Sequence, residues 1–183
     1  MGPGRTFSSE HQRRMRLKHA TSAGYGAHRH LYLHDTMRRI AAEVAAAAGR
    51  RPTLFDYGCG KGRFIAEMTR LGIFADIAGY DPGFAAFSAP PAGRFDVVTC
   101  LDVLDAAEER FHDAIVEDVT RLAAHLAIFD CLTKPLPKSG FPPRPPFYWI
   151  ALVQRRMRMI KTEMHFLGLD GFERAVVIAE PLE

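Results

Sequence analysis

The sequence contains no run of about 18 apolar residues, the minimum for a membrane-spanning helix. Its N-terminus also lacks the apolar core of a secretory signal peptide. We therefore expect no membrane partner, no secretion and a cytoplasmic location. The three cysteines, Cys59, Cys100 and Cys131, are odd in number and do not have the spacing of a zinc site, so no metal is expected. They favour reduced thiols over a disulfide framework, in agreement with the same compartment.

The chain also has little excess charge of either sign. Its 24 Lys and Arg against 21 Asp and Glu leave a formal net charge of +3, which is too small to predict a nucleic-acid partner. Its 183 residues suffice for one domain with a core and are too few for two ordinary domains. With 48% hydrophobic and 25% charged residues, the composition is typical of a globular protein.

One stretch, Thr53 to Phe64, joins a short apolar segment to a glycine-rich loop. The segment Thr53–Tyr57 suits a buried parallel strand. Gly58, Gly60 and Gly62 then allow the backbone to turn sharply and a ligand to approach it closely. Apolar residues follow at helical spacing, namely Phe64, Ile65, Met68 and Leu71. A strand, a glycine loop and a helix begin a doubly wound fold, whose ligands bind beyond the carboxyl ends of the strands.

The loop departs from the dinucleotide-binding fingerprint, which has a glycine in its sixth place. Arg63 occupies that place, and Asp56 at the strand end would repel a pyrophosphate. A cationic ligand without phosphate, such as S-adenosylmethionine, would not be repelled. Asp81 follows a second predicted strand, Asp76–Tyr80, where a carboxylate can accept hydrogen bonds from both hydroxyls of a ribose.

At this point the chain resembles the class I S-adenosylmethionine-dependent methyltransferases. Three motifs carry the resemblance: Asp56–Gly62 (DYGCGKG), Tyr80–Asp81, and Phe95–Leu104 (FDVVTCLDVL). The resemblance implies an α/β fold, a three-layer αβα Rossmann-like arrangement with a mostly parallel sheet and a C-terminal antiparallel hairpin. It implies S-adenosyl-L-methionine as cofactor and S-adenosyl-L-homocysteine as product. The cofactor-binding residues that it implies are Asp56, Tyr57, Gly58, Cys59, Gly60, Gly62, Asp81, Pro82, Leu101, Asp102 and Val103.

One departure from the family lies between the second strand and the next. Only the 13 residues Pro82–Arg94 separate Asp81 from the strand Phe95–Cys100. This is too short for a helix and a strand together, so we expect the third strand to be missing or vestigial. Phe84 or Phe87 could stack on adenine in place of the lost contacts, or could simply cap the sheet edge. The exposed edge could serve as the surface of a homodimer.

A second departure concerns the candidate bases. A common version of the third motif continues Asp-Val-Leu-Glu-His, whereas Ala106 stands in the place of that histidine here. In methyltransferases a segment ahead of the first strand often covers the site, and residues 24–34 supply His28 and His30 there. The catalytic candidates are therefore His30, His28 and Asp102, since histidine is a suitable base near neutral pH. The alternative is that the histidines brace the helix predicted from Leu31 to Ala48.

The remaining segments complete the predicted organisation. Residues 1–23 are basic and weakly patterned, and are interpreted as a flexible arm, with a lid or a contact to an anionic partner as the alternative. Residues 24–183 form a single methyltransferase domain. The proline-rich stretch 134–147 could form a lid, a substrate wall or a rigid connector. The strands Ile160–Phe166 and Phe172–Ala179 would close the sheet as a hairpin.

The implied reaction is attack of a nucleophile on the cofactor methyl group, with a base that takes the proton of a hydroxyl or amine. A chain without an added recognition domain favours a small-molecule or sugar-like acceptor, as in the biosynthesis of secondary metabolites or surface glycans. An Asn-Pro-Pro-Tyr type motif for exocyclic base amines is absent, which also disfavours nucleic acid. Two alternatives remain: a non-catalytic S-adenosylmethionine-binding protein with the same fold, and a dinucleotide-dependent oxidoreductase.

Overall fold

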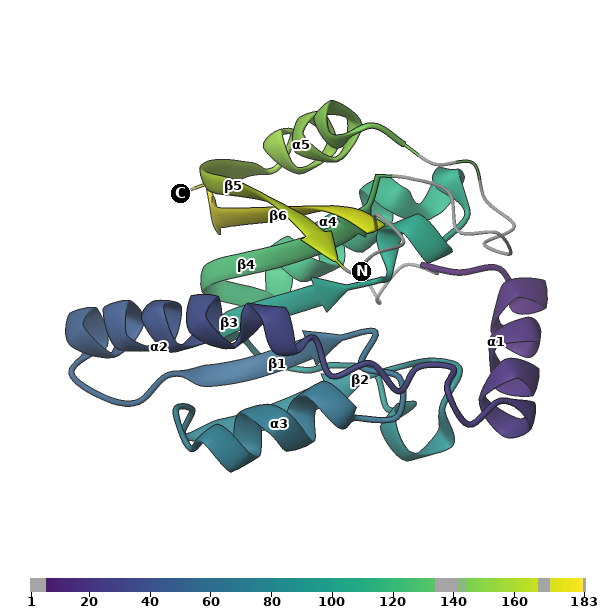
Figure 1. The fold of residues 1–183 in the computed structure, drawn as a ribbon, viewed down its shortest axis with the longest axis horizontal. Helices are drawn as coiled ribbons and strands as arrows, with labels where there is room; N and C mark the ends of the chain where they lie inside the picture. The colour runs from purple at the N-terminus through teal and green to yellow at the C-terminus, as the bar shows by residue number, and fades with distance from the viewer. Residues whose placement is uncertain (1–5, 134–141, 143, 168–171, 183) are drawn as a thin grey trace.

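A computed structural model of the protein describes residues 6–133, 142, 144–167 and 172–182. Its centre is a six-stranded sheet in the order β2-β1-β3-β4-β6-β5 (Figure 1). Strands β1 to β4 run parallel, whereas β6 lies antiparallel to both β4 and β5. The strands are β1 (Thr53–Tyr57), β2 (Asp76–Tyr80), β3 (Phe95–Leu101), β4 (Ala123–Leu132), β5 (Met157–Leu167) and β6 (Phe172–Pro181). The predicted fold class, with its closing hairpin, is confirmed.

Helices cover both faces of the sheet (Figure 1). The α-helices are α1 (Ser9–Thr21), α2 (His34–Ala48), α3 (Arg63–Leu71), α4 (His112–Leu122) and α5 (Pro146–Gln154). Short 3₁₀ turns are η1 (Leu31–Leu33), η2 (Ala85–Phe87), η3 (Leu104–Ala106) and η4 (Glu109–Phe111). Successive strand residues point to opposite faces. Leu54 therefore packs with α2 and α3, whereas Phe55 packs with α4 and α5.

The segment between β2 and β3 is short, as the sequence predicts. It carries only η2, so β2 forms the edge of the sheet and no strand lies beyond it within the described residues. The expectation of a missing third strand is confirmed. Most of the proline-rich stretch 134–147, by contrast, lies outside the described residues, as does the turn of the hairpin at 168–171.

The helix α1 is a correction to the sequence analysis, which predicted no helix before Leu31. Its start is capped by Ser8, whose side chain accepts a hydrogen bond from the N–H of His11 at 3.0 Å. The buried residues of α1 are His11 and His19, which are polar, so the apolar periodicity that reveals a helix is absent. The helix lies beyond the carboxyl ends of β1 and β3 (Figure 1). The flexibility of the arm stays a prediction.

Some boundaries also differ from those predicted. Strand β5 begins at Met157, three residues before the predicted strand Ile160–Phe166, and β6 ends at Pro181, two residues after the predicted strand Phe172–Ala179. The helix α4 ends at Leu122 and β4 begins at once with Ala123, so no loop separates these two elements.

Replacing Ile128 by alanine tests the core that positions the site. Its side chain is fully buried on the central strand β4, so we expect the free energy of unfolding to fall by about 2–5 kcal/mol. The control is Ile160→Ala on the edge strand β5, where 53% of the residue is exposed. That change should cost less than about 0.5 kcal/mol. Urea unfolding followed by circular dichroism measures both, and equal losses would contradict the assignment of the core.

Candidate functional site

The glycine loop after β1 is closely packed against its neighbours. Gly58 has φ +82° and Gly60 has φ +55°, a region that glycine adopts without strain. A Cβ atom on Gly58 would collide with the side chain of Val103, and one on Gly60 would collide with the backbone of Gly26. The N–H of Lys61 also donates to the carbonyl of Gly26 at 2.6 Å. The loop is therefore enclosed by the β3 loop on one side and by the segment after α1 on the other.

Gly62 has a different role from the other two glycines. A Cβ atom there would lie 2.8 Å from the ring of Phe87, which packs over it. The ring of Phe84 in turn lies 5.3 Å from that of His19. Neither phenylalanine lines the cavity described below, so the structure favours the packing alternative over the stacking of these rings on adenine.

Asp81 connects the ends of β1 and β2. Its carboxylate accepts the N–H of Gly60 at 3.0 Å and the N–H of Gly83 at 2.7 Å. Only 4% of the residue is exposed. Burial raises the pKa of Asp81, and the two backbone N–H groups oppose that rise. A buried carboxylate at this strand end could accept ribose hydroxyls.

Asp56 is a second buried carboxyl group at the end of β1. The hydroxyl of Thr99 donates to Asp56 Oδ1 at 2.8 Å. Burial raises the pKa of Asp56 to about 7, although the Thr99 hydrogen bond opposes the rise. Near neutral pH the group is therefore divided between its neutral and ionised forms.

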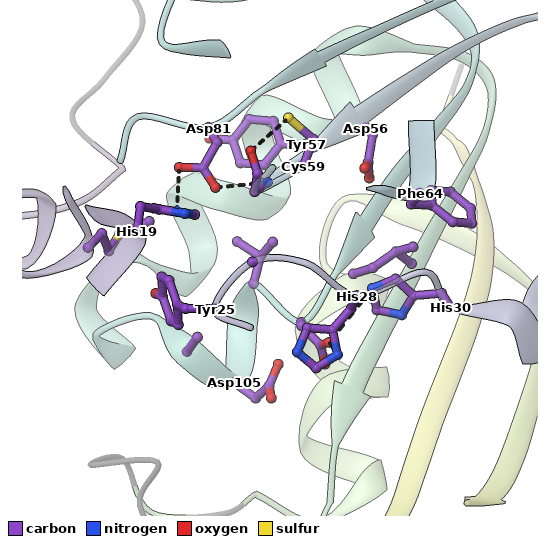
Figure 2. Close-up of a pocket in the computed structure, with 18 of the residues that line it drawn as sticks. His19, Tyr25, His28, His30, Asp56, Tyr57, Cys59, Phe64, Asp81 and Asp105 are labelled. Carbon is purple, nitrogen blue, oxygen red and sulfur yellow. Dashed lines mark hydrogen bonds and ion pairs between the residues drawn. The ribbon is translucent and has the colours of Figure 1, made fainter. Parts of the chain in front are cut away.

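A cavity of about 740 Å³ opens beside these groups (Figure 2). Every predicted cofactor-binding residue except Gly62 lines it. Lys61 and Arg63, the two cations of the glycine loop, do not. The ammonium group of Lys61 instead donates to the carbonyl of Ser22 at 2.7 Å. The walls at the loop itself therefore offer carboxyl groups and backbone, whereas Arg14, Lys18 and Arg29, which also line the cavity, come from α1 and the segment after it.

The three predicted catalytic residues, His28, His30 and Asp102, line the same cavity. Figure 2 shows the two histidines next to each other, on the side of the cavity away from Asp81. Asp102 Oδ2 lies 3.8 Å from His28 Nδ1 and 3.7 Å from His30 Nε2. His30, with φ 45°, and Asp102, with φ 58°, are the described non-glycine residues with positive φ. Strained backbone of this kind is retained where the surrounding structure requires it and is common at functional sites.

A buried ion network, which the sequence analysis did not predict, supports His30 and Asp102. Arg174 on β6 donates from Nε to both oxygens of Asp130, at 2.8 and 2.9 Å, and from Nη2 to Asp102. Tyr32 donates its hydroxyl to Asp130 as well. The partners come from four distant parts of the chain, so no local sequence signal could have indicated them.

The network sets the protonation of the pair. Burial acts to raise the pKa of Asp102, but Arg174 and the histidines outweigh it and lower that pKa. Burial lowers the pKa of His30 to about 4, although Asp102 opposes this. At neutral pH the pair is therefore a carboxylate beside an uncharged imidazole.

Asp105 is a further cavity residue, which the sequence analysis did not predict. Burial and then the charge of Asp102 raise its pKa to about 8. Its Oδ1 atom is buried and has no hydrogen-bond partner among the described residues. Figure 2 shows its carboxyl group between Tyr25 and His28. Its position beside the lost histidine of the motif, at Ala106, is the signal that could have identified it.

No group of three or more His, Cys, Asp or Glu side chains among the described residues is arranged to hold a metal ion. No helix in that part of the chain has both the length and the apolar character that crossing a bilayer requires.

Among doubly wound folds, the class I methyltransferases combine a closing antiparallel hairpin with a ligand cavity beyond the first two strands, and this chain shares both features. The family of methyltransferase domains matches residues 9–127, and the chain belongs to this family. The resemblance to the class I S-adenosylmethionine-dependent methyltransferases is thereby confirmed. The matched region begins at the first residue of α1. No curated protein matches the chain in sequence.

Several solved structures share the fold. A 1,6-didemethyltoxoflavin-N1-methyltransferase from Burkholderia thailandensis, with its substrate and S-adenosylhomocysteine bound, is 16% identical, with a TM-score of 0.63 over 97% of this chain and 92% of that one. The magnesium protoporphyrin IX methyltransferase of Synechocystis PCC 6803, with S-adenosylmethionine bound, is 17% identical. Its TM-score is 0.62, over 96% of this chain and 99% of that one. The N-methyltransferase NodS of Bradyrhizobium japonicum WM9 is 10% identical, with a TM-score of 0.58 over 94% of this chain and 99% of that one.

The raised pKa of Asp56 predicts a pH-dependent cost in stability. Between about pH 4 and pH 7 the folded protein keeps a proton on Asp56 that the unfolded chain has released, so the free energy of unfolding falls as the pH rises. The loss amounts to about 4 kcal/mol for a shift of about three pKa units. Asp56→Asn cannot ionise and removes this loss.

We therefore expect the variant to gain stability relative to the wild type as the pH rises from about 4.5 to about 8. Urea unfolding at both pH values measures the difference in free energy of unfolding between the variant and the wild type. Groups that titrate alike in the two proteins cancel in this difference. A constant difference between the two proteins would show that Asp56 ionises normally in the folded state.

Proposed function

We propose that this protein transfers a methyl group from S-adenosylmethionine to a hydroxyl or amine group of a small-molecule or sugar-like acceptor. The observation that carries the proposal is that one cavity joins the glycine loop and Asp81 to the pair His30 and Asp102. When bound, S-adenosylmethionine supplies a methyl group that is activated by its positive sulfur. The protein's main task is then to hold the acceptor close and aligned.

At the cofactor end, the proposed roles follow from charge and space. Asp81 accepts hydrogen bonds from the ribose, and the backbone of Gly58, Cys59 and Gly60 approaches the amino-acid part of the cofactor. Asp56 and the segment Leu101–Val103 form the adjoining wall. The ammonium group of Lys61 faces the end of α1 instead and does not line the cavity.

At the acceptor end, charge favours a neutral or cationic acceptor over a carboxylate. Arg174 is buried, and its guanidinium group is already engaged by the carboxylates of Asp102 and Asp130. An acceptor carboxylate would therefore find no free cation in this network and would meet the negative charge of Asp102. The unpartnered oxygen of Asp105 instead suits an O–H or N–H donor.

We assign His30 as the general base and Asp105 as the group that orients the acceptor. His30 is uncharged at neutral pH because burial lowers its pKa, so it can take a proton. The resulting imidazolium would lie 3.7 Å from a carboxylate oxygen of Asp102 and 3.7 Å from one of Asp130, which stabilise its charge. Asp102 itself is a weaker base because Arg174 lowers its pKa. His28, with 65% of its side chain exposed, lies at the mouth as an acceptor contact.

A panel of acceptors tests the substrate class. We expect release of S-adenosylhomocysteine from S-adenosylmethionine in the presence of phenols, alcohols, sugars, amines or N–H heterocycles, and none with carboxylic acids of matching shape. The measurement is S-adenosylhomocysteine formation by mass spectrometry, with NAD turnover followed in parallel. Methylation of carboxylates alone would contradict the charge argument. Tight binding of S-adenosylhomocysteine without turnover on any acceptor would favour the non-catalytic alternative.

Replacing His30 by asparagine tests the base. Asparagine tolerates the left-handed backbone of this position but cannot take the proton, so kcat should fall by about 10²–10⁴-fold. The affinity for S-adenosylhomocysteine and the melting temperature should change little. The control is His125→Asn, because His125 is half exposed and pairs with Asp96 at the amino ends of the strands. An unchanged kcat in His30→Asn would show that His30 is not the base. Either Asp105 would then take the proton or no protein group would.

A further inference from the structure

The helix α1 brings a histidine to the carboxylate at the end of β2. His19 Nε2 lies 3.6 Å from Asp81 Oδ1, and the two side chains are only 4% and 5% exposed. Figure 2 shows the imidazole ring beside that carboxylate, at the edge of the cavity that both residues line. The helix that supplies it was not expected from the sequence.

The polar atoms of this ring have no hydrogen-bond partner among the described residues, although Nε2 lies within ion-pair distance of Asp81. Neither His19 Nδ1 nor His19 Nε2 makes a hydrogen bond to another described residue, and both atoms are buried. Burial lowers the pKa of His19, although the charge of Asp81 opposes this, so the ring is uncharged at neutral pH. Buried donors and acceptors are almost always satisfied in folded proteins, and an unsatisfied one costs free energy. A ligand in the cavity could satisfy these two.

The ring is also held in a defined orientation. Its centroid lies 4.8 Å from the ring of Tyr25, which it meets edge-on, and 5.3 Å from that of Phe84. A Cβ atom on Gly26 would lie 2.5 Å from the ring, and one on Gly83 would lie 3.3 Å from it. The absence of side chains at these two glycines therefore makes room for the imidazole, which is packed on several sides and does not swing freely.

The end of α1 is fastened to the glycine loop itself. Lys61 Nζ donates to the carbonyls of Ser22 and Ala23, at 2.7 and 3.2 Å, just beyond the last turn of the helix. A cation at this end also interacts favourably with the helix dipole. With the hydrogen bond from the N–H of Lys61 to Gly26, three contacts fix the position of His19 relative to the loop.

We propose that His19 is a cofactor-binding residue, which with Asp81 holds the ribose hydroxyls of S-adenosylmethionine, so that α1 forms one wall of the cofactor site. This inference rests on the proposed function only in taking S-adenosylmethionine as the ligand. A ribose hydroxyl beside the pair donates to Asp81 and accepts the N–H of the imidazole. Binding then satisfies the N–H of the ring, and the bound nucleoside joins α1 to the sheet.

The test is a double-substitution cycle between His19 and the ribose. Calorimetric titrations compare S-adenosylhomocysteine with its 2′-deoxy and 3′-deoxy analogues, in the wild type, His19→Ala and His19→Gln. We expect His19→Ala to weaken S-adenosylhomocysteine about tenfold, the effect of one lost hydrogen bond. One of the two deoxy analogues should lose affinity in the wild type and lose clearly less in His19→Ala. The control, His125→Ala, should leave all three affinities unchanged.

Two outcomes overturn the inference while leaving the proposed function intact: equal affinity of the wild type and His19→Ala for S-adenosylhomocysteine, or fully additive losses for both analogues. Failure of the wild type to bind S-adenosylhomocysteine would overturn the proposed function as well.

Hydrogen exchange of the wild type gives a second test that needs no variant. Saturation with S-adenosylhomocysteine should slow the exchange of backbone amides in α1 as well as in the glycine loop. Slower exchange in the loop alone, with α1 unchanged, would show that the helix takes no part in binding and would overturn the inference even if the His19 variants did not fold.

Discussion

The rest of the site depends on the carboxylate of Asp81. Because it accepts backbone N–H groups from Gly60 and Gly83, it fixes the loop after β1 to the loop after β2. The carbonyl of Tyr80 adds to this by accepting the N–H groups of Gly58 and Cys59, at 2.7 and 3.0 Å. The glycine loop is thus shaped by its neighbour strand before any ligand arrives. Preorganisation of this kind lowers the entropic cost of binding.

The two ends of the cavity differ in how they handle charge. The end at β1 and β2 presents carboxyl groups whose ionisation burial opposes, and hydrogen bonds from backbone and a threonine hydroxyl partly offset that cost. At the end at β3 and β4, a buried guanidinium group keeps Asp102 ionised, whereas burial raises the pKa of Asp130 and of Asp105. One fold can therefore hold acidic groups of different basicity within a single cavity, and the left-handed backbone at His30 and Asp102 sets their mutual approach.

Much of this molecule is predictable from local sequence. The glycine loop, the acidic residue after β2 and the short connection to β3 are consecutive in the chain, so residue type and spacing suffice to indicate them. The helix α1 is not predictable in this way, because its buried side chains, His11 and His19, are polar and give no apolar periodicity. The role of Arg174 depends on the register that pairs it with Leu132 across β4 and β6, which no local pattern specifies. The environment of Asp105 likewise arises only from tertiary packing.

The approach of Gly26 to Gly60 has a consequence for how this chain can vary. Two backbones 34 positions apart in sequence touch without room for a side chain on Gly60, and His19 fills the space beside Gly26. These three positions form one linked set, in which a change at one is tolerated only with changes at the others. Variation that alters the acceptor is therefore most accessible outside this set, at His28 and Leu31, which border the same cavity and are exposed.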